Sequence, residues 1–287
     1  MRYSHRFFLY APIGAFAIVA IAASVHWWMA ANAFSRRLDA LNGQALMPGV
    51  TLHFASKRIS GFPFRLDAVF KHFGITIAAT RGPITWSSDN FAVHRLTDSY
   101  DKEIFEAAGQ QKITWTGRSG KKQNTAFLPA RLRASSISGA KGLARFDLEL
   151  FGASGPDFAL ETLQFHMRRD PAKQVLDFVA NMDGLKLAHA TRYGDTLKRL
   201  DLTGTIGPVA SLLALLDGET RWQTAADTWR AAHGRITINA GSLRWNKATL
   251  SVKGTIALDS RKKPAGDLHV TANGTPVQAP LGKAALY

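Results

Sequence analysis

The residues best suited to acid–base or metal chemistry, the histidines, are scattered along this 287-residue chain. There are nine, and no two lie within five positions of each other. Known metal sites on one helix or hairpin bring their ligands closer together than that. We therefore interpret the histidines as surface or core residues and expect no metal site. A site assembled from distant residues is the alternative.

No motif of a catalytic or nucleotide-binding site is present. H-E-x-x-H, G-x-S-x-G and G-x-G-x-x-G do not occur, and residues 117–121 (GRSGK) lack the upstream glycine and the following Ser or Thr of a phosphate-binding loop. The chain has no cysteine, which excludes thiol catalysis, iron–sulfur clusters and thiolate zinc sites. The sequence thus predicts a protein that is not an enzyme and needs no cofactor, with a hydrolase of dispersed site as the weaker alternative.

One short motif stands out instead, Gly61-Phe62-Pro63-Phe64-Arg65. Proline in a sheet is confined to edges, strand starts and bulges, and glycine permits a turn that a side chain would resist. We predict a structural role in which Phe62 and Phe64 anchor the first long strand in the core while Arg65 lies on the opposite face. The alternative is that Arg65 binds an anionic headgroup or the carboxylate of a partner.

A weak internal repeat is the second candidate. Residues 82–93 and 241–252 align without gaps in their glycine, aliphatic, tryptophan and valine positions. We interpret each unit as strand, tight turn, strand, a hairpin repeat marked by Gly82 and Trp86 in one copy and Gly241 and Trp245 in the other. Duplicated half-domains and chance similarity are both open explanations.

The elements that would position these residues are mainly strands. Apolar and polar residues alternate in residues 62–70, 146–150, 163–167, 185–187 and 200–203, as a half-buried strand requires, and glycines fall between many of the alternating runs. This pattern predicts a long antiparallel β-meander built of successive hairpins. In 208–216 and 221–233 the apolar spacing changes to three or four residues, which predicts an inserted helical hairpin at about 208–233.

The N-terminus carries an uncharged apolar run, residues 7–25, followed by His26-Trp27-Trp28. Residues 7–29 are long enough to cross the ~30 Å hydrocarbon core, and the paired tryptophans suit the membrane interface. We expect an anchor at 1–33, a short helical continuation at 35–44 and an extracytoplasmic β-rich domain at 34–287.

Basic residues flank the span on both sides, Arg2 and Arg6 before it and Arg36 and Arg37 after it. The short tail resembles the start of an export signal, so we favour a single-pass protein of the inner membrane with its body in the periplasm. The rival is a cleaved signal peptide ending at Ala31-Asn32-Ala33. The apolar run is longer than the ~7–15 residues typical of cleaved signals.

Lysine and arginine together number 36 and aspartate and glutamate 21, a net charge of +15. Such a charge draws a membrane-tethered body toward anionic headgroups. The basic residues are scattered, without the aromatic and basic pattern of RNA-binding modules. We therefore expect the bilayer, and phospholipid, as partners, and no nucleic acid.

Three features together resemble one known family: the Gly61 to Arg65 motif after an N-terminal span, the segment from Gly82 to Trp86, and Leu243-Arg244-Trp245 leading into residues 253–259. Over nearly the whole chain the sequence is similar to the domain-of-unknown-function 2125 family of Gram-negative bacteria. The resemblance implies an envelope protein with a β-rich body, no established activity and no assigned catalytic residues. It also implies a further helical stretch after Asp259, where this chain is short.

The order of elements is also similar, by architecture alone, to AsmA-like envelope proteins associated with lipid traffic. We therefore expect a non-enzymatic, membrane-anchored envelope protein that binds or guides lipid along an apolar sheet face. A scaffolding role is the main alternative. An apolar groove would favour lipid, and a compact pocket with converging histidines and carboxylates would favour an enzyme.

Overall fold

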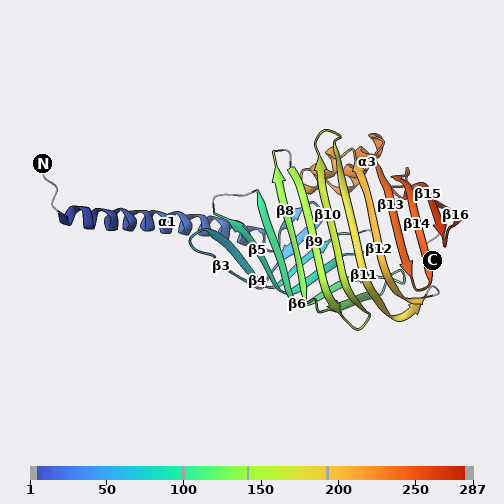
Figure 1. Ribbon diagram of the computed structural model, residues 1–287, viewed down its shortest axis with the longest axis horizontal. Helices are drawn as coiled ribbons and strands as arrows, with labels where there is room; N and C mark the ends of the chain where they lie inside the picture. Colours follow the sequence, from blue (N-terminus) through green and yellow to red (C-terminus); the bar gives the residue numbers. More distant parts are fainter. Residues whose placement is uncertain (1–4, 80, 98–100, 141, 192–193, 282–287) are drawn as a thin grey trace.

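The structure, a computed structural model, describes residues 5–79, 81–97, 101–140, 142–191 and 194–281. It consists of a long N-terminal helix, one large sheet and two short helices (Figure 1). In chain order the elements are α1 (His5–Leu41), β1 (Ala45–Met47), β2 (Val50–His53), β3 (Ser56–Ser60), β4 (Arg65–Ile77), β5 (Ile84–Leu96), β6 (Lys102–Thr116), β7 (Lys122–Phe127), β8 (Arg131–Gly139), β9 (Gly142–Ser154), β10 (Phe158–Asp170), β11 (Val175–Thr191), β12 (Gly194–Gly207), α2 (Ala210–Leu216), α3 (Trp222–Ala231), β13 (Arg235–Trp245), β14 (Ala248–Leu258), β15 (Pro264–Ala272) and β16 (Thr275–Leu281).

Helix α1 runs without a break for 37 residues, about 55 Å at 1.5 Å per residue. It contains a stretch of mean hydropathy 1.7 with none of its residues buried, so it is long and apolar enough to cross a membrane. The predicted helical continuation is confirmed, because the helix ends only at Leu41. Beyond it the Asn42 side chain donates a hydrogen bond to the Phe54 carbonyl and accepts one from the Phe54 amide, which ties the helix end to the sheet.

The fold is mainly β, and the predicted antiparallel meander is confirmed. The sixteen strands of the described residues form one sheet, whose main path runs β1-β2-β4-β5-β6-β8 and then in chain order to β16. Two strands lie off this path: β3 pairs with β4, and β7 pairs with β6. Most neighbours in the sheet are therefore also neighbours in the chain, as successive hairpins require.

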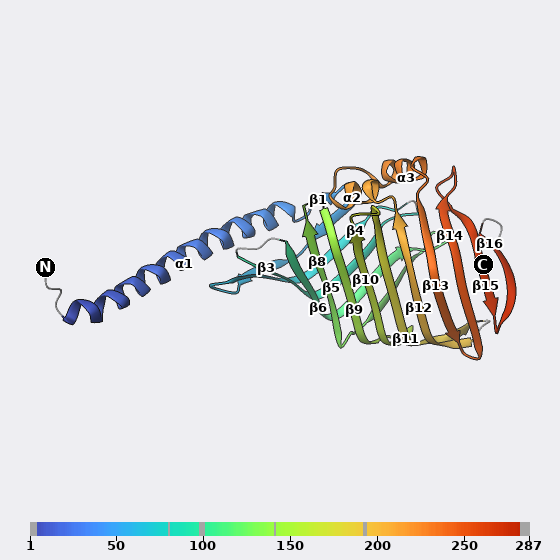
Figure 2. The ribbon, with the colours of Figure 1, turned by 45° about the horizontal axis from the view of Figure 1, so that its top comes forward.

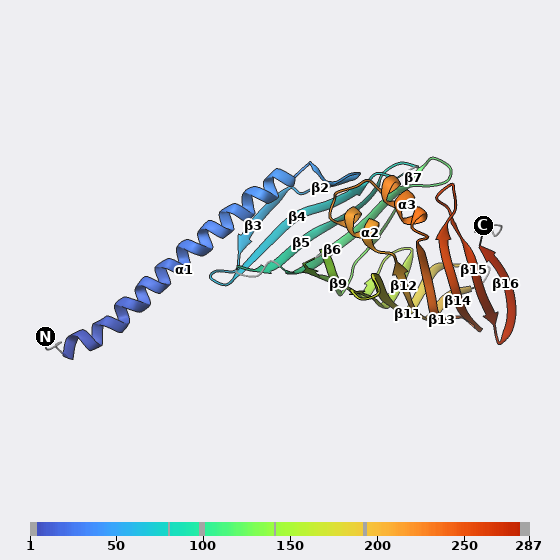
Figure 3. The same ribbon diagram turned by 90° about the horizontal axis from the view of Figure 1, so that it is seen from above.

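The sheet turns a corner at β6. The first half of β6, Lys102 to Ala107, pairs with β8, whereas the second half, Gln111 to Thr116, pairs with β7. Seen from above, β2 to β6 form one wall and β9 to β16 a second wall that diverges from it (Figure 3). The sheet is thus a trough, and α1 approaches it at the end where the walls meet.

The predicted helical hairpin is confirmed as α2 and α3, which lie at one rim of the trough (Figure 2). Val209, fully buried just before α2, and Leu213 on the helix pack against Leu176 of β11. This contact closes the hairpin onto the second wall.

Two expectations about the strands are corrected. Several glycines expected between strands lie inside them, among them Gly109, Gly152 and Gly184, all with positive φ, in β6, β9 and β11. The strands are consequently longer than the alternation suggested. After Asp259 the chain continues as β15 and β16 and not as a helix, and the end of the chain from Gly282 lies outside the described residues.

Candidate functional site

The inner face of the trough carries an apolar row that is unbroken across the strands from β4 to β15. Each member is the direct cross-strand partner of the next, and every one is apolar. The row consists of Phe70, Phe91, Ala107, Leu132, Leu150, Leu163, Met182, Leu200, Leu243, Leu250 and Ala272.

A second row, two residues along each strand, is also without a polar side chain. It consists of Ala68, Val93, Phe105, Ala134, Leu148, Phe165, Ala180, Leu202, Gly241, Val252 and Val270. From β9 onward its members are half-buried, except for the buried Gly241, so these side chains line the trough and are only partly covered.

The row between these two points to the other face and is polar from β6 onward. It consists of Glu106, Arg133, Glu149, Gln164, Asn181, Asp201, Ser242, Ser251 and Thr271. Because successive side chains of a strand point to opposite faces, the meander separates a polar exterior from an apolar interior over most of its width.

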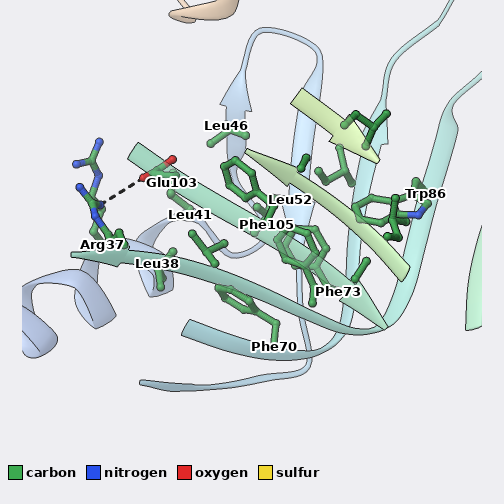
Figure 4. A pocket seen from close by; sticks show the side chains of 18 of the residues that line it. Arg37, Leu38, Leu41, Leu46, Leu52, Phe70, Phe73, Trp86, Glu103 and Phe105 are labelled. Atoms are coloured by element: carbon green, nitrogen blue, oxygen red, sulfur yellow. Dashed lines mark ion pairs between the residues drawn. The ribbon is translucent and has the colours of Figure 1, made fainter. Parts of the chain in front are cut away.

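The interior is hollow at the α1 end. A cavity of about 860 Å³ lies between the last turns of α1 and the strands from β4 to β9 (Figure 4). Its walls are mostly aromatic and aliphatic. Leu38 and Leu41 of the helix line one side, the rings of Phe70, Phe73 and Phe105 lie on the sheet, and Trp86 lies farther from the helix. A volume of this size falls in the range of small-molecule pockets.

The charged residues of this cavity lie on the side of helix α1. Arg37, Arg95 and Glu103 are the charged residues of its lining, and no histidine is among the described residues that line it. A guanidinium nitrogen of Arg95 lies 3.5 Å from Glu103, and the Arg95 guanidinium also lies over the Phe34 ring, 5.3 Å from its centre. The cavity is therefore apolar in its depth and basic where it meets α1.

A smaller apolar cavity of about 220 Å³ lies between the α2–α3 hairpin and β12 to β14. Trp222, Trp229 and Leu212 contribute to its lining. The hairpin thus covers part of the second wall without filling the space against it.

The outer face holds the group closest to an acid–base site. Asp67 of β4 receives two hydrogen bonds from Arg65, at 2.6 and 3.3 Å, and lies 2.7 Å from Nδ1 of His94 on β5. Burial raises the pKa of the Asp67 carboxyl, but the hydrogen bonds and positive charges of Arg65 and His94 outweigh it, so the pKa lies below its ordinary value. The carboxylate is therefore held in its charged form.

The same arrangement recurs twice along this face, always as arginine, an apolar residue and aspartate. In β9 Arg145 and Asp147 pair, and Asp147 also contacts His166 at 2.8 Å. In β12 Arg199 and Asp201 pair, and Asn181 of β11 donates to Asp201. Recurrence on three strand pairs indicates cross-strand clips rather than one catalytic site. No described residues form a metal-binding group of three or more His, Cys, Asp or Glu.

The prediction that Phe62 and Phe64 anchor the core is wrong. Phe62 is 56% exposed and Phe64 72% exposed, because β4 begins only at Arg65 and the two rings belong to the preceding turn. The core anchors are instead later apolar residues of β4, Phe70 and Phe73. Arg65 has a half-exposed guanidinium and is paired with Asp67.

The hairpin repeat is also corrected. Residues 241–252 do form a hairpin, made of the end of β13 and the first five residues of β14, but 84–93 lie within the single strand β5. Asn246, with a φ of 49°, makes the turn in the second copy, whereas the first copy continues as one strand opposite a bulge in β6. Trp86 lines the large cavity, while Trp245 lies near the opposite edge of the sheet and donates to the Gly194 carbonyl.

The rows of the inner face were missed by sequence reasoning. The alternation in single strands was visible, but the alignment of one strand's apolar residues with those of the next depends on turn lengths and bulges. The rows could have been found by pairing the apolar positions of each strand with those of the next strand across every predicted hairpin.

No curated protein and no solved structure matches the chain. The family described as "Uncharacterized protein conserved in bacteria (DUF2125)" matches residues 27–286, from the end of the apolar part of α1 to the last strand and beyond. The chain therefore belongs to the DUF2125 family.

Proposed function

We propose that this protein is a non-enzymatic envelope protein, anchored in the inner membrane by α1, whose trough binds lipid acyl chains and guides them along the sheet. One observation carries the proposal: the two apolar rows run side by side from β4 to β15 without a polar side chain. Aliphatic and aromatic walls gain free energy by removing acyl chains from water, at roughly 0.8 kcal/mol per buried CH₂.

The length of the rows supports guidance along a path. The eleven strands are separated by ten spacings of about 4.8 Å, which give a path of roughly 48 Å. One leaflet of the hydrocarbon core is about 15 Å thick. The rows thus exceed the length of one acyl chain about threefold, which suits movement or several bound chains better than one fixed ligand.

The position of the cavity supports entry from the membrane. Phe34 of its lining lies seven residues beyond Trp27, about 10 Å along the helix. A chain of leaflet length can reach that far while its other end stays in the bilayer. Arg37 and Arg95 on the same side of the cavity suit the anionic phosphate of a lipid headgroup.

The contacts of α1 support an uncleaved anchor. Ala31 lies in the stretch that a signal peptidase would need to bind, and only 7% of its surface is exposed. Phe34 and Leu38 of the same helix pack on the core of the first wall. A body in the periplasm is the corresponding proposal for topology, from the basic residues before the span, of which Arg2 lies outside the described residues.

The proposal can be tested by photo-crosslinking in the full-length protein. A photoreactive phenylalanine replaces Phe105 in the large cavity, and in a matched variant it replaces Val179, which is 37% exposed on the polar outer face. After irradiation in native membranes, we expect phospholipid attached at position 105 and not at position 179, as read by mass spectrometry.

An absence of lipid at position 105, in a variant that folds and reaches the membrane, would contradict lipid binding and leave the scaffolding alternative. Equal attachment at both positions would mean that lipid contacts the protein without entering the trough. That result would also contradict the proposal.

A further inference from the structure

We propose that the turn between β3 and β4 is a second membrane-contacting element, which inserts Phe62 and Phe64 into the bilayer interface beside α1. The inference rests on the proposed function in one respect, that α1 crosses the membrane. Its occupant is the lipid bilayer itself and not another protein.

The β3–β4 hairpin runs along α1 toward the apolar half of the helix. At its base Lys57 bonds to Ser35 and Asp39 of α1, with distances of 2.7 and 2.8 Å. At its tip Trp27 donates from Nε1 to the Arg65 carbonyl at 2.7 Å, and its ring meets Phe62 edge to face at 5.6 Å. The pictures show the hairpin alongside the helix from different sides (Figures 2 and 3).

These contacts place the tip at a definite level of the helix. From Ser35 back to Trp27 is eight residues, or about 12 Å along the axis. Trp27 and Trp28 end the apolar part of α1, and tryptophan pairs at such a boundary sit at the headgroup level. The turn therefore meets the helix where the bilayer interface would be.

Hydrogen bonds hold the backbone of the β3–β4 turn, although the phenylalanine rings of the turn are exposed. The Arg65 amide donates to the Gly61 carbonyl at 2.8 Å, and the Phe64 carbonyl accepts from both the amide and the hydroxyl of Thr97 at 3.1 Å. Phe64 nevertheless leaves 72% of its surface exposed. A rigid backbone that presents an uncovered phenyl ring loses little conformational entropy when that ring enters another phase.

The neighbours of the turn suit an interface. Leu96, the cross-strand partner of Arg65, is 48% exposed and adds a third apolar side chain. Arg65, the residue that follows Phe64, carries a half-exposed guanidinium, which suits the level of anionic headgroups. Together with α1, the turn would attach the body at two points and restrict how the trough tilts over the membrane.

The test uses full-length protein in nanodiscs of phosphatidylcholine with phosphatidylglycerol. Because the chain has no cysteine, single spin labels can be placed through Phe64→Cys, Leu96→Cys, Trp28→Cys and Trp222→Cys. Trp222 is a matched exposed aromatic, 54% exposed on α3, remote from α1. The measurement is the accessibility of each label to oxygen, which favours lipid, relative to a water-soluble nickel chelate.

We expect a severalfold higher oxygen-to-nickel ratio at Phe64 and Leu96 than at Trp222, with the ratio at Trp28 also high. Water-like ratios at Phe64 and Leu96 with a lipid-like ratio at Trp28 would overturn the inference while leaving the anchor intact. A water-like ratio at Trp28 would overturn the anchor as well. Protection of Phe64 from both agents would indicate a protein contact, such as a second copy, and would also overturn it.

Discussion

The exposed fraction of each aromatic side chain indicates whether that side chain stabilises the fold. Phe70 is 1% exposed and packs against Phe54, Phe73 and Phe91. We expect Phe70→Ala to lower the free energy of unfolding by about 3–5 kcal/mol. Phe64→Ala, at a site 72% exposed, should change it by less than about 1 kcal/mol. Denaturant midpoints of the two variants in the same detergent decide the matter, and equal losses would contradict the burial seen here.

Asp67 gives the fold a dependence on pH. Its pKa is lowered in the folded state, since the hydrogen bonds and charges of Arg65 and His94 overcome the effect of burial. The stabilisation is present above the unfolded pKa of about 4 and is lost as the pH falls through the folded value. Asp67→Asn should lower the free energy of unfolding by roughly 1–3 kcal/mol at neutral pH.

The same variant should flatten the acid limb of stability against pH. Asp177→Asn, at an exposed aspartate on the outer face of β11, controls for the loss of one negative charge. Parallel acid limbs in wild type and Asp67→Asn would show that the clip does not contribute. The repeated arginine–apolar–aspartate triplets of the sequence were a sign of these clips, but their partners His94, His166 and Asn181 follow only from strand register.

At the scale of elements, the corner of the sheet depends on a bulge in β6. Between Ser88 and Asn90 of β5, β6 carries one extra residue, and Gly109 there has a φ of 77°. Asp89 fixes the bulge by accepting a hydrogen bond from the Gln110 amide at 2.9 Å. The break falls between the halves of β6 that pair with β7 and β8, so it lets one strand serve both walls.

We expect Gly109→Ala to destabilise the protein by roughly 2–4 kcal/mol, from left-handed strain and overpacking together. A new Cβ would lie 2.9 Å from Cβ of Asp89. Gly120→Ala is the matched control, because Gly120 has the same φ of 77° but nothing within 4 Å. It should cost only the strain, about 1–2 kcal/mol. Equal losses in thermal or denaturant unfolding would mean that the bulge is not tightly packed.

The element types were largely predictable because they depend on local pattern. The apolar period identified α1, the helical hairpin and several strands. The bulges were not predictable, because the sequence does not distinguish a glycine inside a strand, such as Gly109 or Gly184, from a glycine in a turn between strands. For the same reason Trp86 and Trp245 shared a sequence pattern without sharing a structure.

At the scale of the whole molecule, the proposed orientation is open to direct measurement. Ser4→Cys and Lys121→Cys each introduce a single thiol, one before the apolar run and one in the exposed β6–β7 turn. In spheroplasts of a Gram-negative host, an impermeant maleimide should label position 121 at once and position 4 only after lysis. The reverse pattern would invert the topology. Loss of the position 4 label from the full-length band would reveal cleavage.

The length of the trough allows a test of whether lipid moves along the apolar rows. A single storage pocket would hold lipid only in the large cavity at the α1 end. A path would also admit it where the rows continue, at Phe165 of β10 and Leu243 of β13. These positions lie about 14 Å and 29 Å beyond Phe105, three and six strand spacings along the sheet. Both distances are measured along the curved surface.

With photoreactive residues at 105, 165 and 243 of the full-length protein, we expect phospholipid at all three positions, because the apolar rows pass through each without interruption. The fraction labelled should fall with distance from α1 if lipid enters from the membrane there. Met182→Arg, in the first row between positions 165 and 243, should then reduce labelling at 243 and spare 105. Met182 is half-buried on the inner face, and a charged guanidinium placed there loses part of its hydration when an acyl chain passes over it, which costs free energy. Labelling at 105 alone in the unmodified trough would restrict the function to holding lipid.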